Sequence, residues 1–258
     1  MRYHLLLLLL AMATIVPVEG SGQSKKVKLF NGTHLNHWYT FIAGKGRDTD
    51  PNKVFTLQNK FIRISGEEYG CLTTKDEYEN YILTAKFKWG NKTWGEREYN
   101  ARDCGILLHS VGKDGDWGNA WLYSVEYQII EGATGDYWLL GDDSKDYAIT
   151  SNVKDAPQGA FMYDPGGKPV TIHKGRIDRR FRDPDWKDVK DFRGRNEIEK
   201  RHGKWNRVKC VVRDGQIWNY LNGKLVNHAY DVKPRSGKIQ LQSEMAEVFF
   251  KDIKLRKL

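Results

Sequence analysis

Strict alternation of apolar and polar residues is the feature that most constrains the fold of this chain. Within 122–130, apolar Val125, Tyr127 and Ile129 alternate with polar residues. Successive side chains of a β-strand point to opposite faces, so this pattern predicts a strand with one face in a core and one polar face. Two further segments repeat the pattern. The polar faces would carry His109 in 104–109, Glu126 and Gln128 in 122–130, and Lys238, Gln240, Gln242 and Glu244 in and just after 237–242.

Strand-like segments dominate the chain, and turn residues separate several of them. Asp214-Gly215 and Asn222-Gly223 are dipeptides preferred in two-residue hairpin loops, so they predict a three-stranded meander over 207–228. No long stretch has helical periodicity, although 185–202 has room for a short helix. Many short antiparallel strands predict an all-β jelly roll, a sandwich of two antiparallel sheets. The expected strands are 54–57, 60–65, 80–89, 104–109, 122–130, 169–173, 207–213, 216–221, 224–228, 237–242 and 247–256.

The N-terminus has the form of a secretory signal peptide. Arg2 precedes an apolar run from Leu5 to about Val16, and small residues follow. The run is short for a bilayer span, so cleavage near Gly20 is favoured over an uncleaved anchor, and no stable membrane anchor is expected. We therefore expect a signal peptide over about 1–22 and a single domain over 27–258, exported to the periplasm or the extracellular space.

The cysteines and the charge exclude several classes of protein. Cys71, Cys104 and Cys210 allow at most one disulfide, and we expect three buried thiols instead. The net charge of +9 is concentrated in 174–204, where acidic residues are interspersed with basic ones. No nucleic-acid recognition motif accompanies this charge, so we expect a solvated insertion and no nucleic-acid partner.

A pair of glutamates offers one catalytic interpretation. Glu126 and Glu131 lie five residues apart, similar to the E-x-D-x-x-E strand of retaining endoglucanases. Gln128 stands at the position of the central Asp, and an unbulged strand would send Glu131 to the opposite face. A retaining endoglycosidase that uses these two glutamates is therefore an alternative.

Known motifs for metal and nucleotide chemistry are absent from the sequence. His109 has neither an H-x-H nor an H-E-x-x-H partner, so local sequence predicts no metal site. No G-x-S-x-G elbow, Walker loop or dinucleotide fingerprint occurs, which argues against nucleotide-dependent redox chemistry within the chain.

The tryptophans favour a sugar ligand. Nine Trp residues are spread over the chain, and most are expected to fill the core. Trp94, Trp117 and Trp121 lie in loops near the polar strands, where an indole ring can stack on a pyranose ring. We expect Trp94 and Trp121 to bind substrate. Amides, carboxylates and imidazole beside Trp suit a sugar better than a nucleic acid or a lipid.

The chain as a whole resembles the 3-keto-disaccharide hydrolase family, formerly a domain of unknown function, whose members have a concanavalin A-like sandwich. The order of the matching segments is more specific than any one of them. Asp103-Cys104 stands where the family often has Asn-Ser, and His109 stands where it often has Arg. The matching segments are LFNGTHLNHW (29–38), GCLTTKDEYENYILTAKFKW (70–89), CGILLH (104–109), YSVEYQIIEG (123–132), GKWNRVKCVV with IWNYLNGKLV (203–226) and GKIQLQSEMAEVFFKDIKLRKL (237–258).

The resemblance implies cleavage of 3-keto-glycosides or 3-keto-disaccharides. A separate sugar 3-dehydrogenase would oxidise C3, which acidifies the hydrogen on C2. A base then removes this proton, the aglycone leaves C1 by elimination, and water adds, which amounts to net hydrolysis. The groups that could supply the base are Glu126, Glu244 and His109. Sugar hydroxyls could bind Gln128, Gln240 and Gln242, and the enolate oxygen could bind Lys238 or a divalent cation.

Two further classes of function stay open at this point. A non-catalytic, lectin-like carbohydrate-binding module of the same fold would use only the polar face and the Trp rings. Several ionisable groups on one strand face favour an enzyme over such a module. The natural glycan, the anomeric preference, the metal requirement and the oligomeric state are not determined by the sequence.

Overall fold

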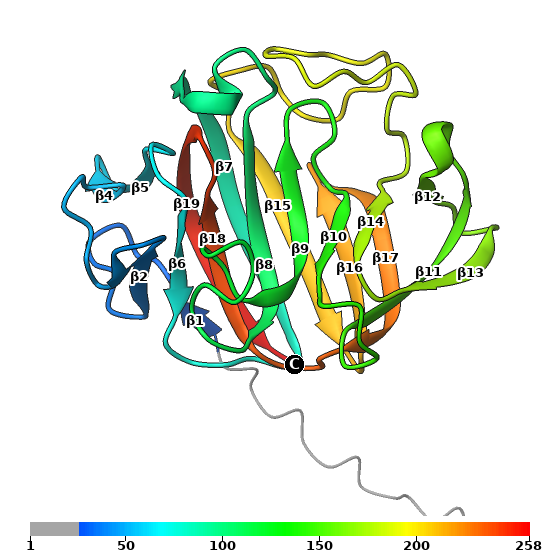
Figure 1. Ribbon diagram of the computed structural model, residues 1–258, viewed down its shortest axis with the longest axis horizontal. Helices are drawn as coiled ribbons and strands as arrows, with labels where there is room; N and C mark the ends of the chain where they lie inside the picture. Colours follow the sequence, from blue (N-terminus) through cyan, green and yellow to red (C-terminus); the bar gives the residue numbers. More distant parts are fainter. Residues whose placement is uncertain (1–25) are drawn as a thin grey trace, which may run out of the picture.

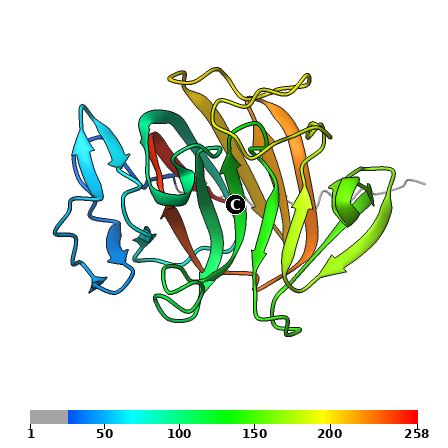
Figure 2. The ribbon, with the colours of Figure 1, turned by 45° about the horizontal axis from the view of Figure 1, so that its top comes forward.

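The computed structural model describes residues 26–258, which form β-strands joined by short turns. The strands pack as two layers, and Figures 1 and 2 show one layer in front of the other. The predicted all-β sandwich is confirmed. The only helical segments in this described part of the chain are the short 3-10 turns η1 (Gly95–Arg97) and η2 (Pro157–Gly159).

The front sheet carries the strands that the sequence alternation singled out. Its order is β3-β2-β6-β18-β8-β9-β10-β14-β12-β11-β13, and every pairing is antiparallel except that of β12 with β14. Its strands are β2 (Trp38–Ile42), β3 (Gly46–Arg47), β6 (Gly70–Thr74), β8 (Asp103–Val111), β9 (Tyr123–Ile130), β10 (Tyr137–Leu140), β11 (Ala148–Asp155), β12 (Phe161–Tyr163), β13 (Lys168–Ile172), β14 (Gly175–Asp178) and β18 (Lys238–Ser243).

The back sheet closes the other side of the core. Its order is β4-β5-β19-β7-β15-β16-β17, and β1 pairs with the second half of β19. Strand β17 also pairs with β11, so it joins the two sheets along one edge. The strands are β1 (Lys26–Lys28), β4 (Phe55–Gln58), β5 (Phe61–Ile64), β7 (Tyr81–Thr93), β15 (Asn206–Arg213), β16 (Gln216–Leu221), β17 (Lys224–Lys233) and β19 (Ala246–Lys257).

Alternation along the strands explains the core. Ile106 of β8 and Val125 and Tyr127 of β9 are fully buried between the sheets, where they belong to the same cluster as Leu83 and Phe250 of the back sheet. Burial of this apolar surface is the main force that holds the two sheets together. The polar residues of β8, β9 and β18 are thereby left on the outer face of the front sheet.

The predicted meander is confirmed by its turns. Asp214 and Gly215 both have positive φ, and so do Asn222 and Gly223. Two successive residues with positive φ form the type I′ hairpin turn, which Asn-Gly and Asp-Gly adopt readily. Strands β15, β16 and β17 therefore follow one another as antiparallel neighbours.

Residues 185–202, which have room for a short helix, do not form one. Figures 1 and 2 show this segment as irregular loops at one end of the sandwich. The side chain of Asp183 accepts hydrogen bonds from the backbone N–H groups of Asp185 (2.9 Å) and Arg195 (2.7 Å). Such side-chain bonds to the backbone compete with helix formation.

Several strands have no alternation signal in the sequence. All five residues of β6 are buried, because its inner face meets the core and its outer face is covered near Cys71 by Ala120 and Trp121. A strand buried on both faces loses the period of two by which strands are recognised. The same is true of most of β10 and of the first half of β11.

The cysteine prediction is confirmed, because Cys71, Cys104 and Cys210 are all buried free thiols. The expected signal peptide, 1–22, lies outside the described residues. Within 26–258, no helix is long and apolar enough to cross a bilayer.

Candidate active site

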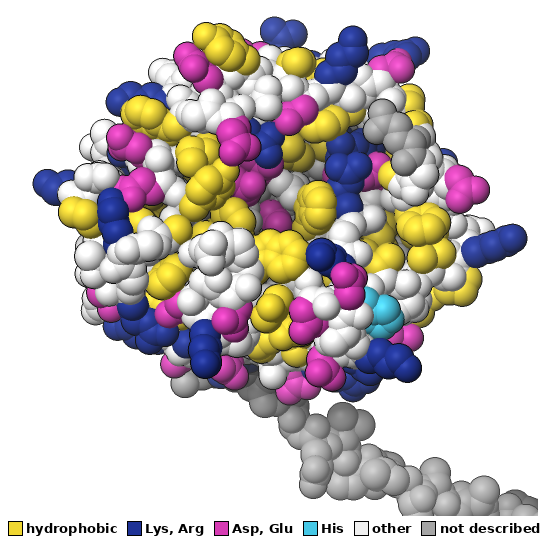
Figure 3. All heavy atoms as spheres, viewed as in Figure 1, with side chains coloured by type: hydrophobic (Ala, Val, Ile, Leu, Met, Phe, Trp, Pro, Cys, Tyr) yellow, Lys and Arg dark blue, Asp and Glu magenta, His cyan; other side chains and the backbone are white. Residues whose placement is uncertain are grey.

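A cleft of about 260 Å³ opens on the outer face of the front sheet. Strands β8, β9 and β18 form its floor, since Gly105 pairs with Gln128 and Leu107 pairs with Glu126 across β8 and β9, and β18 adjoins β8 on the other side. Figure 3 shows this face, with acidic side chains in a central hollow and hydrophobic side chains around it.

Gly105 makes room for the polar groups on the floor. A Cβ atom at this position would overlap Glu126 Oε1 and would lie 2.5 Å from Gln242 Oε1. The two side chains therefore lie over the same glycine from neighbouring strands. Both oxygens are buried and have no hydrogen-bond partner among the described residues, which is unusual for buried polar atoms.

Asp103 and Arg97 form a charged pair at one end of the cleft. The guanidinium of Arg97, in η1, donates to Asp103 Oδ2 at 2.5 Å, and Gln128 Nε2 donates to Asp103 Oδ1. Glu244 lies beside this pair, because its backbone forms a bridge with that of Asp103. Three carboxyl groups, those of Asp103, Glu126 and Glu244, thus line one cleft together with one guanidinium.

Burial and mutual repulsion raise the pKa of each of these carboxyl groups. Burial raises the pKa of Glu126 well above its usual value, and the charges of Glu244 and Asp103 raise it further. The pKa of Glu244 is also raised well above normal, by burial and by Asp103. Burial raises the pKa of Asp103 to about 7, although Arg97 and Gln128 oppose this rise. Because ionisation of one group favours a proton on another, the cleft can hold a base and an acid at the same pH.

The structure brings together five of the residues predicted from the sequence. Glu126, Gln128, Gln242, Glu244 and Trp121 all line the cleft. The indole N–H of Trp121 donates to the carbonyl oxygen of Gly70 at 2.9 Å, which fixes the ring at the cleft wall. The expectation that the polar faces of β9 and β18 meet in one cleft therefore holds for these residues.

Gln240 and His109 lie elsewhere. Gln240 is fully buried beneath the Trp121 loop, where its amide contacts Cys71 and Thr73 and accepts from the Leu122 N–H. The expectation that Gln240 faces the cleft is wrong, because its amide already forms these hydrogen bonds beneath the loop.

The expectation that His109 shares a face with Glu126 is also wrong. A bulge interrupts β8 after Leu108, and His109 has a φ of 52°. The ring turns to the inner side, where Nδ1 lies 2.8 Å from the carbonyl oxygen of Pro234 and the ring edge meets Tyr81. Burial lowers the pKa of His109 to about 4.

Lys238 and Trp94 are also absent from the cleft lining. The ammonium of Lys238 lies 5.1 Å from the ring centroid of Tyr39, near the far end of β18. The indole N–H of Trp94 donates to the carbonyl oxygen of Ser65 at 3.0 Å. The expectation that these two side chains contact the same ligand as Glu126 has no support in the geometry.

Trp117, one of the three loop tryptophans considered for stacking on a sugar, also lines the cleft, and four lining residues were not predicted: Arg97, Asp103, Trp138 and Leu140. Trp138 pairs with Glu126 across β9 and β10, so its indole stands next to the carboxyl group. Asp103 precedes the expected strand by one residue, and Arg97 reaches the cleft from a loop. If the alternating pattern of 104–109 is extended back by one residue, Asp103 falls on the polar face. No nearby sequence pattern identifies Arg97 as a residue of the cleft.

The described residues give no support for a metal site. Among 26–258, no group of three His, Cys, Asp or Glu side chains is arranged to hold a metal ion. In the cleft, Asp103 is already paired with the Arg97 guanidinium. We therefore derive no step through a divalent cation.

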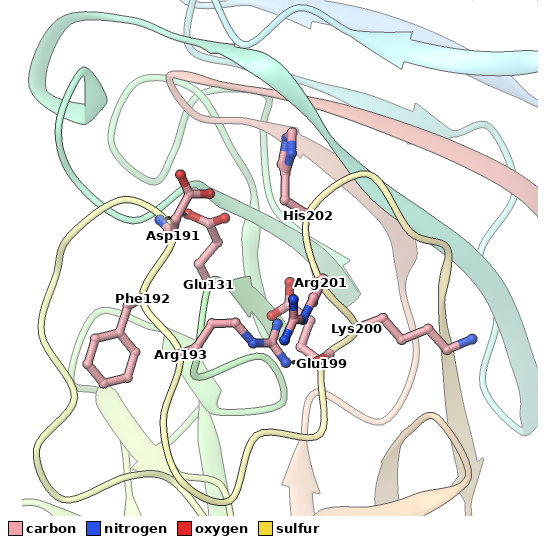
Figure 4. Close-up of a pocket in the computed structure, with 9 residues that line it drawn as sticks. Glu131, Asp191, Phe192, Arg193, Glu199, Lys200, Arg201 and His202 are labelled. Atoms are coloured by element: carbon pink, nitrogen blue, oxygen red, sulfur yellow. Dashed lines mark hydrogen bonds between the residues drawn. The ribbon is translucent and has the colours of Figure 1, made fainter.

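Glu131 belongs to a different cavity, of about 350 Å³, shown in Figure 4. Its carboxylate accepts from the Arg102 guanidinium and from the Arg102 and Asp191 N–H groups (3.1 and 3.2 Å). Figure 4 shows Glu131 close to Asp191, with Arg193 and Arg201 farther along the cavity near Glu199. Because Glu126 and Glu131 line separate cavities, the geometry does not support a retaining pair.

Glu199, which lines the same cavity as Glu131, makes stability depend on pH. It accepts from Trp89 Nε1 (2.8 Å) and Thr134 Oγ1 (2.9 Å), and burial raises its pKa from 4.5 to about 8. The folded state therefore keeps a proton that the unfolded chain releases, so stability falls as the pH rises from 4.5 to about 8.

We expect Glu199→Gln to remove the part of this fall that Glu199 causes, which is at most about 1.4 kcal/mol per pH unit. The raised pKa values of Asp103, Glu126 and Glu244 keep the rest of the fall. Urea unfolding measured across this pH range checks the result. The exposed-site variant Glu67→Gln should keep the slope of the unchanged protein. An equal slope in Glu199→Gln would contradict the assignment.

Comparison with known proteins decides the family. The family model described as the 3-keto-alpha-glucoside-1,2-lyase-like domain matches residues 25–256. The chain belongs to this family. The resemblance read from the sequence is thereby confirmed, and the protein is a glycosyl hydrolase-like, carbohydrate-active domain of the lyase-like family.

Solved structures agree on the fold. Two from Parabacteroides distasonis ATCC 8503, both described as candidate glycosyl hydrolases, are similar to this member of the lyase-like family. One is 18% identical with a TM-score of 0.53, over 91% of this chain and 100% of its own. The other is 17% identical with a TM-score of 0.51, over 90% and 94%. The fold is the predicted concanavalin A-like jelly roll. No curated protein matches the chain significantly.

Proposed function

We propose that this protein cleaves 3-keto-glycosides by removal of the C2 proton and elimination of the aglycone, and that Glu126 is the base. The observation that carries the proposal is the buried, unpartnered Oε1 of Glu126 on the floor of a cleft with two further carboxyl groups. A carboxylate whose pKa is raised is a stronger base once ionised.

The reaction needs both a base and an acid. Ionised Glu126 takes the C2 proton, and the C2–H electron pair forms an enolate with the C3 carbonyl. The enolate then returns its electrons to form the C1–C2 double bond, and the C1–O bond to the aglycone breaks. A protonated Glu244 gives its proton to the departing oxygen, a role that suits its raised pKa. Water added across the double bond would complete net hydrolysis.

Arg97 takes the place that the sequence suggested for Lys238. Its guanidinium lines the cleft, whereas Lys238 does not. A fixed positive charge beside the C3 oxygen would stabilise the enolate, and a partly water-excluded cleft strengthens this effect. Trp117, Trp121 and Trp138 form apolar walls on which a sugar ring can stack.

The biological setting is part of the same proposal. A 3-keto-glycoside must be made by an enzyme that oxidises C3 of a glycoside, so a separate sugar 3-dehydrogenase would supply the substrate. The signal-peptide pattern over 1–22 supports export to the periplasm or the extracellular space without a stable membrane anchor.

A pair of substrates distinguishes this function from its alternatives. We expect release of the aglycone from a 3-keto-glucoside and none from the parent glucoside. Release from the parent would favour an ordinary glycosidase. Binding without release from either would favour a carbohydrate-binding module.

An isotope experiment tests the proposed step directly. Deuterium at C2 of the 3-keto-glucoside should lower kcat if loss of the C2 proton limits the rate. Solvent deuterium should also appear at C2 of recovered substrate if the enolate returns its proton. Mass spectrometry and initial rates check both results. Product that keeps the whole C2 label would exclude the elimination.

A further inference from the structure

A second pocket, of about 280 Å³, lies beside the cleft across β10 and β14. Strand register shows how the two are related. Glu126 pairs with Trp138 across β9 and β10, and Trp138 pairs with Arg176 across β10 and β14. Paired residues of antiparallel strands point to the same face of a sheet. Glu126, Trp138 and Arg176 therefore stand in one row.

The neighbouring residues confirm which face this is. Tyr137 pairs with both Tyr127 and Ile177, and all three are fully buried in the core between the sheets. Arg176 and Asp178, one position to either side of Ile177, therefore project outward. They line the second pocket on the same surface as the cleft. In Figure 3, basic side chains lie beside the hydrophobic border of the central hollow.

The spacing of the row matches a disaccharide. Two steps between neighbouring strands span about 10 Å, at about 4.8 Å a step. A sugar whose C2 lies at Glu126 would thus place its leaving group past Trp138 and against Arg176. The guanidinium of Arg176 lies 5.9 Å from the ring centroid of Trp138, so indole and guanidinium meet at the boundary of the two pockets.

The second pocket has the chemistry of a neutral, hydroxyl-rich ligand. The side chain of Asp178 is only 7% exposed, and its Oδ1 lies 2.7 Å from Arg176 Nε. Arg182 lies 3.7 Å from the other oxygen and also lines the pocket. Asp183 also lines the pocket, and the buried Asp136 pairs with Arg182, so neither arginine carries an unpaired positive charge. Such a set offers donors and acceptors to vicinal hydroxyls without favouring an anion.

We propose that this pocket, formed by Met162, Arg176, Asp178, Arg182, Asp183 and Trp186, binds the leaving sugar of a neutral 3-keto-disaccharide. The inference rests on the proposed function, because it assumes that the oxidised ring occupies the cleft at Glu126. It assigns the protein a preference for a second sugar ring over a small aglycone.

Two variants test the pocket. Arg176→Gln removes the charged donor, and Met162→Trp fills the space opposite Asp178, with which Met162 pairs. For each, kcat/KM is measured on a 3-keto-disaccharide and on a 3-keto-glucoside with a small alcohol as aglycone. We expect the ratio of the two values to fall about tenfold to a hundredfold, the effect of one lost hydrogen bond to a charged group.

Arg180→Gln is the matched control, because Arg180 is exposed, belongs to the same segment and does not line the pocket. It should keep the ratio of the unchanged protein. Thermal melting verifies that each variant is folded. An unchanged ratio in both pocket variants, with the small substrate still cleaved, would overturn the subsite and leave the proposed function intact. A preference for an aglycone that carries a carboxylate would also overturn it.

If no 3-keto substrate is cleaved, equilibrium binding decides whether the second pocket holds a sugar ring. That outcome rejects the proposed function, but calorimetry with a disaccharide and its monosaccharide still tests the pocket. Tighter binding of the disaccharide, lost in Arg176→Gln and Met162→Trp, would support the second subsite. Equal binding of the two sugars would overturn it.

Discussion

Glu126→Gln is expected to lower kcat on a 3-keto-glycoside by about a hundredfold to ten-thousandfold, or roughly 3 to 5 kcal/mol of barrier. The amide has nearly the size of the carboxyl group, and Glu126 forms no ion pair with the described residues, so the fold should persist. The amide cannot accept the C2 proton, so the loss should appear in kcat more than in KM. Initial rates and circular dichroism check the two parts.

The exposed-site variant Glu77→Gln is the control for this change and should retain full activity. Loss of solvent exchange at C2 in Glu126→Gln would identify proton removal as the affected step. A Glu126→Gln enzyme with undiminished kcat would exclude Glu126 as the base and would direct attention to Glu244.

Gly105→Ala should lower kcat/KM by roughly a hundredfold with little change in stability. The new methyl group would occupy the place of Glu126 Oε1 and lie 2.5 Å from Gln242 Oε1. Both are ends of flexible side chains, so they can move away, but the base then leaves its working position. A displacement of about 1 Å can cost a hundredfold in rate.

Gly166→Ala is the matched control, since the nearest atom to its added Cβ is 3.8 Å away and neither glycine has a positive φ. It should leave kcat/KM unchanged, and both variants should melt close to the unchanged protein. Full activity in Gly105→Ala would mean that the observed position of the Glu126 carboxyl group is not the one used in the reaction.

Much of the fold and half of the site follow from periodicity. The alternation in 122–130 places Glu126 and Gln128 opposite the core, and the pattern in β18 does the same for Gln242. Both predictions succeed because antiparallel pairing carries the alternation of one strand onto its neighbours. The Asp-Gly and Asn-Gly turns succeed because few other residues tolerate positive φ at both turn positions.

The site residues that were predicted wrongly or not at all have physical causes that the alternation of residues cannot predict. One extra residue in β8 turns His109 from the outer face to the inner one, and no residue type announces this bulge. Gln240 has the correct face, but the Trp121 loop covers it. Arg97 is held by Asp188, 91 residues later in the chain, and this contact depends on the completed fold.

The floor of the cleft and the end that Arg97 occupies come from different kinds of structure. Glu126 and Gln242 are held by paired strands, whereas Arg97 sits in a loop that Asp188 of the insertion holds through an ion pair at 3.0 Å. Changes in loop length can therefore alter what fits above the carboxyl groups while the strands keep them in place. Members of the family would then come to accept different substrates mainly through insertions and deletions in the loops at the ends of the strands. The carboxyl groups on the strands would stay the same.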